Sequence, residues 1–432
     1  MLLLSACNSN QTPLERRQAK AKEADDKNSN KIIIGITWPR DESKAVDLVT
    51  GVRFAVEEWH NQCVLNNDKA ELCDFLQNKE IELKEEDESI DDEGMSDSER
   101  YRLEQNNTHR IARKFANNLN IIAVIGHRKS AQAISASITY EQQGIVFLAP
   151  TATNLALTNH NFKYVFRLMP NNDELSVKMA DYFKNNNYKR VAILYERNVY
   201  AEEFAETFMK NSTNKVDIVF QQSFFQKEED FTEILGNLKK KSFLLDAIFL
   251  VTDDEKACKI IEQADDLDID KPFAGGDAVF GSQLESCPKA RETVVPTIID
   301  ESRLNAFKKD LEKSLELKYG KKINVESISN TEYQKALLGD DAINLLVHVI
   351  NQIKSTKPIE IANKLRYMNP WEGKLGEYAF ENDGNLKRDN AINLAILCPK
   401  PEDPQKLFFK ISSDLSPKCD INNSMITPAG NQ

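Results

Sequence analysis

The sequence IIAVIGHRKSAQAISASITYEQQGIVFLAPTATNLALT, residues 121–158, contains two short apolar runs separated by a helical pattern. The runs at 121–126 and 145–150 have the length and composition of strands that are buried on both faces. Between them, residues 130–143 carry small and apolar side chains at the spacing of an α-helix. A strand, a helix and a second strand in this order predict a βαβ unit, whose two strands run parallel.

The same alternation extends outward in both directions along the chain. Further strands are predicted at residues 32–36, 81–83, 190–195, 216–224, 246–251 and 272–276. Further helices are predicted at residues 45–59, 109–118, 201–210 and 255–265. Strands that alternate with helices predict an α/β fold, with parallel sheets that helices cover on both faces.

The composition indicates a large globular protein and excludes several kinds of partner. The 432 residues are 41% hydrophobic and 29% charged, which is enough for two or three domains. The formal net charge is −12, from 68 acidic and 56 basic residues, so a nucleic acid would be repelled. The sequence has no run of about 18 apolar residues, and we therefore expect no membrane-spanning segment.

The N-terminus carries a pattern typical of a bacterial lipoprotein signal. Leu4, Ser5 and Ala6 precede Cys7, and small residues at this place suit a lipoprotein signal peptidase that leaves the cysteine to carry a lipid. Residues 1–7 are therefore expected to be a signal remnant, with a chance match as the alternative. Residues 8–30 are polar and predict a flexible tether of about 25 Å. These features predict a protein that is lipid-anchored to the membrane, in the periplasm or at the cell surface.

Six further cysteines fit an oxidising compartment. Two pairs that are close in sequence would each close a loop, and the third follows by elimination, although six cysteines allow fifteen connectivities. The cysteines and histidines lack the spacing of a zinc site, and we expect no metal and no cofactor. The expected pairs are Cys63 with Cys73, Cys398 with Cys419, and Cys258 with Cys287.

Residues 84–107 form a densely acidic segment between a predicted strand and a predicted helix. We interpret it as a solvated insertion that runs into an extended helix, because its carboxylates lack the glycine and the ligand spacing of a calcium loop. A site for a cation or for a partner protein is the alternative interpretation.

Polar loops follow both strands of the central βαβ unit. Ser130 is predicted to cap the helix after the first strand, where free N–H groups, such as that of Ala131, attract an anion. Thr151 and Thr153 follow the second strand. Ligands of parallel α/β sheets bind beyond the carboxyl ends of the strands, so the two loops together predict a site for a carboxylate. For Ser130 alone, a structural helix cap is the alternative.

Residues 124–158 resemble the signature region of leucine/isoleucine/valine-binding proteins, the substrate-binding components of branched-chain amino acid ABC transporters. In that family a strand that ends in glycine leads to a serine-bearing turn, a helix that ends in EQQGI, and a P-x-x-T loop. Five later stretches resemble the family in the same order, so the resemblance covers most of residues 31–412. They are YVFRLMPNNDELSVKMADYF (164–183), RVAILYERNVYAEEFAETF (190–208), DAIFLVTDDEKACKIIEQA (246–264), FAGGDAVFGS (273–282) and GKLGEYAFENDGNL (373–386).

This resemblance implies a type I periplasmic binding protein, with two doubly wound parallel-sheet lobes joined by three crossovers in a Venus-flytrap arrangement. Lobe one would comprise residues 31–167 and 298–390, and lobe two residues 168–297 and 391–412. Residues 413–432 would form a C-terminal tail. In such a protein a small ligand binds between the lobes, and the closed form is what a membrane permease recognises.

The family also implies the residues of the site. Ser130, Thr151 and Thr153 match the positions that hold the α-carboxylate of the ligand. Asp277 matches the acidic residue that receives the α-ammonium group, with a helix cap as the alternative. Tyr200 matches the aromatic residue that closes over the ligand from lobe two, with an ordinary surface residue as the alternative.

Two departures from the family concern the ligand side chain. Trp38 lies in the loop TWPRDESK, which replaces a glycine-rich form, and is a candidate wall of the side-chain pocket or else a core residue. Asp253 and Asp254 stand where the family often has aromatic or small residues. Two carboxylates there favour a polar or cationic amino acid over a branched-chain one.

The sequence therefore predicts a solute-binding lipoprotein that captures an amino acid or a similar small ligand for an ABC transporter permease. Two alternatives keep the same fold: a sensor for a signalling partner, and an outer-membrane lipoprotein that binds and regulates a cell-envelope protein. The sequence contains no G-x-S-x-G motif, no P-loop and no paired histidines with metal spacing, so we expect no enzymatic activity.

Overall fold

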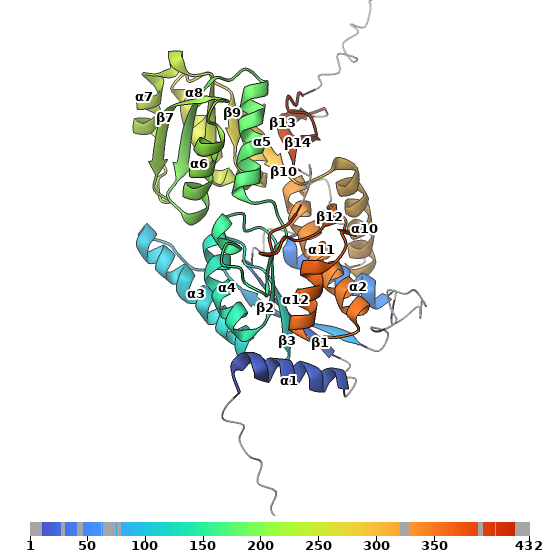
Figure 1. Cartoon of the computed structure of the whole chain (residues 1–432). Helices are drawn as coiled ribbons and strands as arrows, with labels where there is room; N and C mark the ends of the chain where they lie inside the picture. Colours follow the sequence, from blue (N-terminus) through green and yellow to red (C-terminus); the bar gives the residue numbers. More distant parts are fainter. Residues whose placement is uncertain are drawn as a thin grey trace, which may run out of the picture.

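The computed structural model consists of two α/β lobes, one above the other in the view of Figure 1. Each lobe contains a central sheet, and the chain passes between the lobes three times, after residue 167, after residue 297 and before residue 393. This arrangement confirms the predicted α/β fold with parallel sheets in two lobes. The structure describes residues 11–26, 31–40, 46–61, 63, 75, 79–319, 328–387, 392–401 and 403–419.

The first lobe is built on a parallel five-stranded sheet in the order β2-β1-β3-β4-β5. Its central strands are short apolar runs that are buried on both faces, as a parallel sheet covered by helices requires. The strands are β1 (Lys31–Trp38), β2 (Glu80–Asp87), β3 (Ile121–Ile125), β4 (Val146–Ala149) and β5 (Val165–Arg167).

The helices of the first lobe come from both ends of the sequence. Helices α2 and α11 cross in close contact at Gly51 and Gly339, where a Cβ at Gly51 would lie 1.8 Å from the Ala336 carbonyl oxygen. The helical elements are α1 (Pro13–Asp26), α2 (Leu48–His60), α3 (Asp97–Asn117), α4 (Ser130–Gln143), η3 (Leu155–Leu157), α10 (Glu301–Tyr319), α11 (Asn330–Ile353) and α12 (Pro358–Tyr367), followed by the hairpin of β11 (Trp371–Glu372) and β12 (Glu377–Tyr378).

The second lobe contains a seven-stranded sheet in the order β14-β13-β10-β9-β8-β6-β7. Strands β6 to β10 run parallel, and the last two strands extend the sheet antiparallel. The strands are β6 (Arg190–Glu196), β7 (Asp217–Phe224), β8 (Ala247–Val251), β9 (Phe273–Gly275), β10 (Val294–Thr297), β13 (Asn393–Lys400) and β14 (Asp403–Ser412). The helices are α5 (Asn172–Asn185), α6 (Val199–Asn211), α7 (Thr232–Lys239), η4 (Ser242–Leu244), α8 (Asp254–Asp266), η5 (Asp277–Val279), α9 (Ser282–Glu285) and η6 (Pro288–Ala290).

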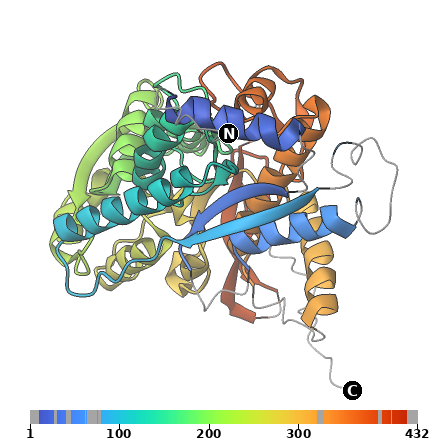
Figure 2. The same cartoon turned by 90° about the horizontal axis from the view of Figure 1, so that it is seen from below.

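Helix α1 contradicts the prediction that residues 8–30 form a flexible tether. It packs across the end of the first lobe that is farthest from the second lobe (Figures 1 and 2). Arg17 is fully buried and donates four hydrogen bonds to carbonyl oxygens where α3 and α4 end and β3 begins, those of Ala116, Asn118, Ile121 and Gln143. Polar contacts of this kind stabilise a segment that has few apolar residues, and the tether prediction counted only apolar burial.

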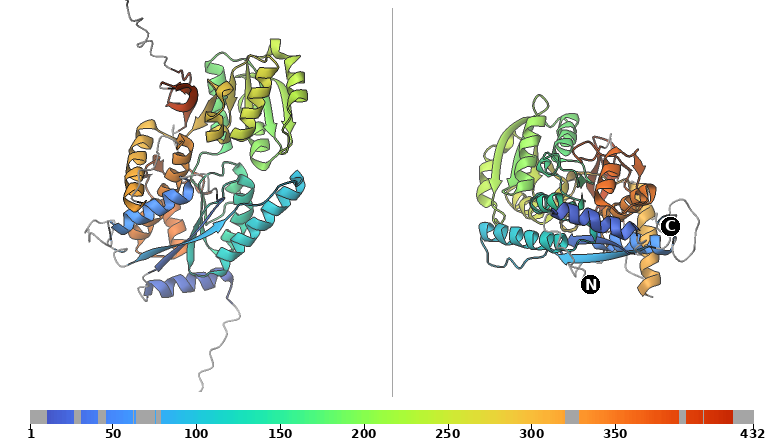
Figure 3. Two further views of the ribbon diagram at one scale, coloured as in Figure 1. Left: turned by 180° about the vertical axis from the view of Figure 1, so that it is seen from behind. Right: turned by 60° about the horizontal axis from the view of Figure 1, so that its bottom comes forward.

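Helix α3 begins twelve residues before the predicted helix at 109–118. Ser96 and Glu99 form a capping box at its start, so the second half of the acidic segment 84–107 is mostly helical. The extended helix projects towards the second lobe (Figure 3). There Asp97 Oδ2 accepts a hydrogen bond of 3.0 Å from the N–H of Gln226, just after β7. The acidic segment therefore touches both lobes.

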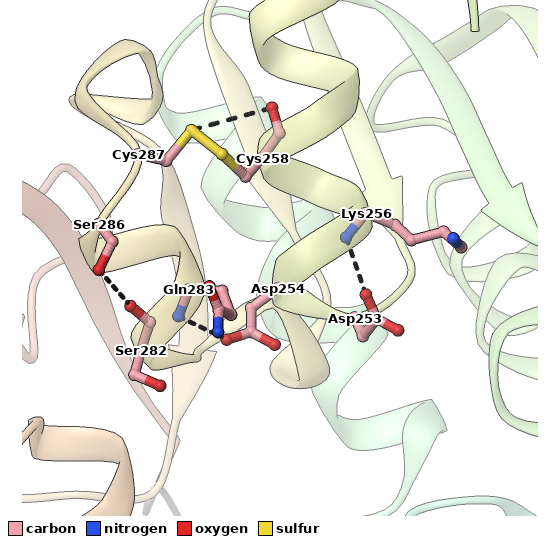
Figure 4. The surroundings of a disulfide bond; sticks show 8 residues. All are labelled: Asp253, Asp254, Lys256, Cys258, Ser282, Gln283, Ser286 and Cys287. Atoms are coloured by element: carbon pink, nitrogen blue, oxygen red, sulfur yellow. Dashed lines mark hydrogen bonds between the residues drawn. A yellow bond between two sulfur atoms is a disulfide. The ribbon is translucent and has the colours of Figure 1, made fainter. Parts of the chain in front are cut away.

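Two of the three predicted disulfides are confirmed. Cys258 of α8 bonds to Cys287, and Cys398 of β13 bonds to Cys419, which ties residues 413–419 to the second sheet. The first of these is shown in Figure 4. Cys73 and Cys7 lie outside the described residues, so the third pair and the lipid attachment stay predictions. In the described part of the chain, no helix is both long enough and apolar enough to cross a membrane.

Candidate ligand-binding site

The polar loops that follow the parallel strands of the two lobes approach each other. Asn154, after β4 of the first lobe, donates a hydrogen bond of 2.7 Å from Nδ2 to the carbonyl oxygen of Val199, the first residue of α6 in the second lobe. The N-terminal ends of α4 and α6 therefore lie on either side of the same inter-lobe region. We call the end of the first lobe at the start of α4 the inter-lobe face of the first lobe. The end of the second lobe at the start of α6 is the inter-lobe face of the second lobe.

The first inter-lobe face contains the predicted carboxylate-binding residues. Ser130 and Ala131 are the first two residues of α4, and Thr151 and Thr153 lie in the loop after β4. The Asn154 N–H donates a 3.5 Å hydrogen bond to Ser130 Oγ, so the two loops are neighbours. Side-chain hydroxyls and the free N–H groups of a helix N-terminus together form a surface that favours an anion.

The prediction that Ser130 caps α4 is wrong by one residue. Lys129 occupies the N-cap position with an extended backbone, and its N–H donates a hydrogen bond of 3.4 Å to the side chain of Gln132. Ser130 is thus the first helical residue, and its hydroxyl is not used to cap the helix. The Oγ accepts only the long bond from Asn154 among the described hydrogen bonds.

Arg167, which the sequence reasoning missed, fixes the loop after β4. Its fully buried guanidinium donates to the carbonyl oxygens of Ala152 at 2.6 Å and Asn154 at 2.8 Å. Burial lowers the pKa of Arg167 to about 10, which leaves it charged at neutral pH. Because this arginine ends β5, where the chain first leaves the lobe, it links the loop to the first crossover. The signal in the sequence that could have indicated Arg167 was a charged residue directly after the apolar residues Val165 and Phe166.

A second buried network supports the turn before α4. His127 is fully buried, with Nδ1 paired to the Glu88 carboxylate and Nε2 2.9 Å from the Tyr140 hydroxyl. Glu88 Oε2 also accepts a hydrogen bond of 3.1 Å from the Arg128 N–H, and Thr151 Oγ1 donates to the Arg128 carbonyl at 2.8 Å. The main chain of residue 128 is therefore held on both sides, which places the start of α4.

On the second inter-lobe face, Tyr200 and Asp277 form a direct pair. Tyr200 is the second residue of α6, and its hydroxyl donates a hydrogen bond of 2.8 Å to Asp277 Oδ1 at the start of η5. Gly276 allows this approach, because a Cβ there would lie 2.6 Å from the tyrosine hydroxyl. Burial raises the pKa of Asp277 to about 6, although the hydrogen bond from Tyr200 opposes the shift.

The adjacent carboxylates belong to the start of α8 (Figure 4). Asp253 is the N-cap, and its side chain accepts a hydrogen bond of 2.9 Å from the Lys256 N–H. Asp254 accepts a hydrogen bond of 2.9 Å from the Gln283 N–H, so its side chain links the start of α8 to α9. Of the two, Asp253 is the exposed one.

Trp38 is the last residue of β1 and not part of the following loop. Its side chain is 5% exposed and belongs to the apolar core of the first lobe. The structure therefore places Trp38 at the carboxyl end of β1, on the same edge of the sheet as the turn before α4, and its burial agrees with the alternative of a core residue.

The family described as the receptor family ligand binding region matches residues 49–374 of this chain. The Leu/Ile/Val-binding protein homolog 2 of Brucella abortus is 25% identical over 279 residues, which are 64% of this chain and 71% of that protein. The Leu/Ile/Val-binding protein of Citrobacter freundii is 28% identical over 178 residues, which are 41% of this chain and 48% of that protein.

Solved structures share the fold. An ABC transporter substrate-binding protein from Desulfitobacterium hafniense, in complex with Leu, has a TM-score of 0.67 at 25% identity, covering 88% of this chain and all of that one. The branched-chain amino acid binding protein LivJ from Streptococcus pneumoniae, in complex with isoleucine, has a TM-score of 0.67 at 20% identity, covering 88% of this chain and 99% of that one.

These matches agree with the two-lobed topology and with the resemblance to leucine/isoleucine/valine-binding proteins found in the sequence. The family match extends over more than half of the chain, from helix α2 to the β11–β12 hairpin. This chain belongs to the receptor family ligand binding region family and has the fold of a type I periplasmic binding protein.

Proposed function

We propose that this chain is an extracytoplasmic solute-binding protein that captures an amino acid between its two lobes and presents it to the permease of an ABC transporter. One observation carries the proposal: the Tyr200–Asp277 pair lies on one inter-lobe face, and the hydroxyl and N–H donors around Ser130 lie on the other. A carboxylate acceptor and a set of donors are complementary to the two charged groups of a zwitterion.

Each site residue has a role in this proposal. Ser130, Thr153 and the N–H groups of Ala131 and Thr151 receive the α-carboxylate. Asp277 receives the α-ammonium group, whose positive charge stabilises the ionised carboxyl against the burial that raises its pKa. In the remaining assignments, Tyr200 covers the ligand, Asp253 faces the ligand side chain, and Trp38 forms a wall of the side-chain pocket.

In this proposal the permease recognises the conformation in which the two lobes have closed on the ligand. The ligand touches both inter-lobe faces only when they approach, so it favours the closed state by the difference in affinity between the two states. We assign residues 31–167 and 298–390 to lobe one, and residues 168–297 and 391–412 to lobe two. The protein acts by binding and not by catalysis, and Cys7 carries the lipid that anchors it at a membrane.

A thermal-unfolding screen of the full chain against the common amino acids tests this function. A ligand at about a hundred times its dissociation constant adds about 2.7 kcal/mol of stability, which raises the melting temperature measurably. We expect one class of amino acid to do so, and Ser130→Ala or Asp277→Ala to abolish the rise.

The matched control is Asp270→Ala, which removes an exposed carboxylate of the same lobe outside the site. This variant is expected to keep the full ligand response. A well-folded chain whose melting temperature no amino acid raises would contradict the proposal. In that case the protein-binding lipoprotein of the same fold would become the better interpretation.

A further inference from the structure

Three carboxyl groups stand at the ends of three neighbouring strands on the second inter-lobe face. Glu196 is the last residue of β6, Asp253 follows β8 by two residues, and Asp277 follows β9 by two residues. In the sheet these strands lie side by side in the order β9-β8-β6. Adjacent strands are about 4.8 Å apart, so the row of carboxyl groups extends over about 10 Å.

Glu196 is the member of this row that the sequence reasoning did not single out. Its side chain is 5% exposed, and Oε2 accepts a hydrogen bond of 3.0 Å from the Thr252 hydroxyl. The other oxygen, Oε1, accepts no hydrogen bond from the residues that the structure describes, and it is not among the fully buried atoms that lack a partner. Burial, followed by the charge of Asp253, raises the pKa of Glu196. A largely buried carboxyl group that keeps one oxygen open to solvent can accept a hydrogen bond from a cationic partner such as a group of a ligand, which would offset the cost of its burial.

The nearby lysines do not supply that partner. Lys129, whose charge acts on Glu196 from the first lobe, forms its ion pair with Glu104 at 2.5 Å. Lys256 forms its ion pair with Glu229 at 2.9 Å. Within the described part of the chain, none of the three carboxyl groups in the row takes part in an ion pair. The row is therefore a local excess of negative charge on the face that meets the ligand.

The spacing of the row distinguishes an extended ligand from a metal ion. A metal ion would draw three ligand oxygens to within a few ångströms of each other, and the described residues contain no such group at these positions. In the proposed function, Asp277 receives the α-ammonium group of a zwitterion whose carboxylate lies at Ser130. Asp253 and Glu196 then lie along the path of the ligand side chain.

We propose that the ligand is an amino acid with a cationic side chain, such as lysine or arginine, and that Glu196 and Asp253 receive the side-chain charge. This inference rests on the proposed function, because it names the class of amino acid for the same site. A flexible methylene stem bridges the distance from Asp277 to the far carboxyl groups, whereas a branched apolar side chain would leave both carboxyl groups without a partner.

Calorimetric titration of the full chain with matched amino acids tests the inference. L-lysine and L-norleucine have the same main-chain groups and similar stems, and only lysine carries the side-chain charge. We expect lysine or arginine to bind at least about tenfold more tightly than norleucine or leucine, since one lost charged contact in a desolvated site costs that much or more.

Variants of the three carboxyl groups in the row identify which residues bind the charged side chain of the ligand. Glu196→Gln keeps the shape of the side chain and is expected to weaken lysine binding by about tenfold or more, with norleucine unaffected. Glu233→Gln, which removes an exposed carboxylate of α7, is the control and is expected to change neither affinity.

The outcomes separate this inference from the function on which it rests. Norleucine or leucine binding as tightly as lysine would overturn the cationic class and leave amino acid binding intact. Failure of all four amino acids to bind a folded chain would also overturn the cationic class, whereas the proposed function itself is overturned only when none of the common amino acids binds. The comparison of lysine with norleucine uses the unmodified protein, so it is decisive even if Glu196→Gln does not fold.

Discussion

Replacement of Asp277 by asparagine should stabilise the ligand-free protein. A carboxylate that must be ionised to bind an ammonium group is held in a half-buried position, where the loss of water makes ionisation unfavourable. Asparagine has the same shape and still accepts the hydrogen bond from Tyr200, but it carries no charge. The variant therefore removes the cost of the buried charge and keeps the packing.

The size of the effect follows from the shift in pKa. The pKa of Asp277 is raised from 3.8 to about 6, and the difference of about 2 units corresponds to about 3 kcal/mol. Partial exposure to solvent reduces this figure, so about 1–3 kcal/mol is expected. The folded-state pKa is the higher one, so the cost is absent below about pH 4, grows between pH 4 and pH 6, and is complete above pH 6.

Urea unfolding of both proteins at about pH 4 and about pH 8 measures the effect. The variant is expected to be more stable than the parent at the higher pH and equally stable at the lower one, while it loses the response to amino acids. Asp270→Asn, which changes an exposed carboxylate, should show neither effect. A variant that is less stable at the higher pH, or a difference that does not depend on pH, would refute the reasoning.

Three other predictions concern stability and are measured by urea or thermal unfolding. Arg17→Met should lower the free energy of unfolding by about 3–5 kcal/mol, because buried carbonyl oxygens lose a charged donor; a loss below about 1 kcal/mol would restore the tether interpretation. Replacing Cys398 and Cys419 by serine should cost about 3 kcal/mol, the entropy of the loop of 21 residues that the disulfide closes, and an unchanged midpoint under oxidising conditions would contradict the pairing. Gly51→Ala should destabilise the first lobe by more than about 2 kcal/mol, because α2 and α11 cannot separate without losing contacts, and a neutral effect would show that they are not packed as described.

The parallel sheets could be predicted because buried strands carry a strong local signal. The runs at 121–126 and 145–150 contain almost only apolar residues, and the expected bounds agree with β3 and β4 to within a residue. Helix α4 has the predicted bounds because the polar turn before it and Gly144 after it both mark its ends. Because these strands alternate with helices along the chain, the sequence also predicted that the strands run parallel in the sheets.

The parts that could not be predicted depend on contacts between distant segments. Arg17 is stabilised by carbonyl oxygens about a hundred residues away, and no local pattern in residues 8–30 indicates them. The early start of α3 did have a local signal, the capping box of Ser96 and Glu99, which the acidic composition of the segment obscured.

The candidate site was predicted in part. The resemblance to the family supplied Asp277 and Tyr200, and the structure adds the hydrogen bond between them. Glu196 was not singled out, because a carboxylate at the end of a strand has many ordinary roles in a sequence. Its significance depends on the neighbouring strand, which brings Asp253 beside it, and on the ion pairs that occupy Lys129 and Lys256.

A crystal structure of the full chain with the amino acid that raises the melting temperature most tests the central claim most directly. The account predicts a single ligand between closed lobes, with its α-carboxylate against Ser130 and the loop of Thr151 and Thr153, and its α-ammonium group on Asp277. A ligand bound elsewhere, or one that leaves Asp277 paired only with Tyr200, would contradict the account.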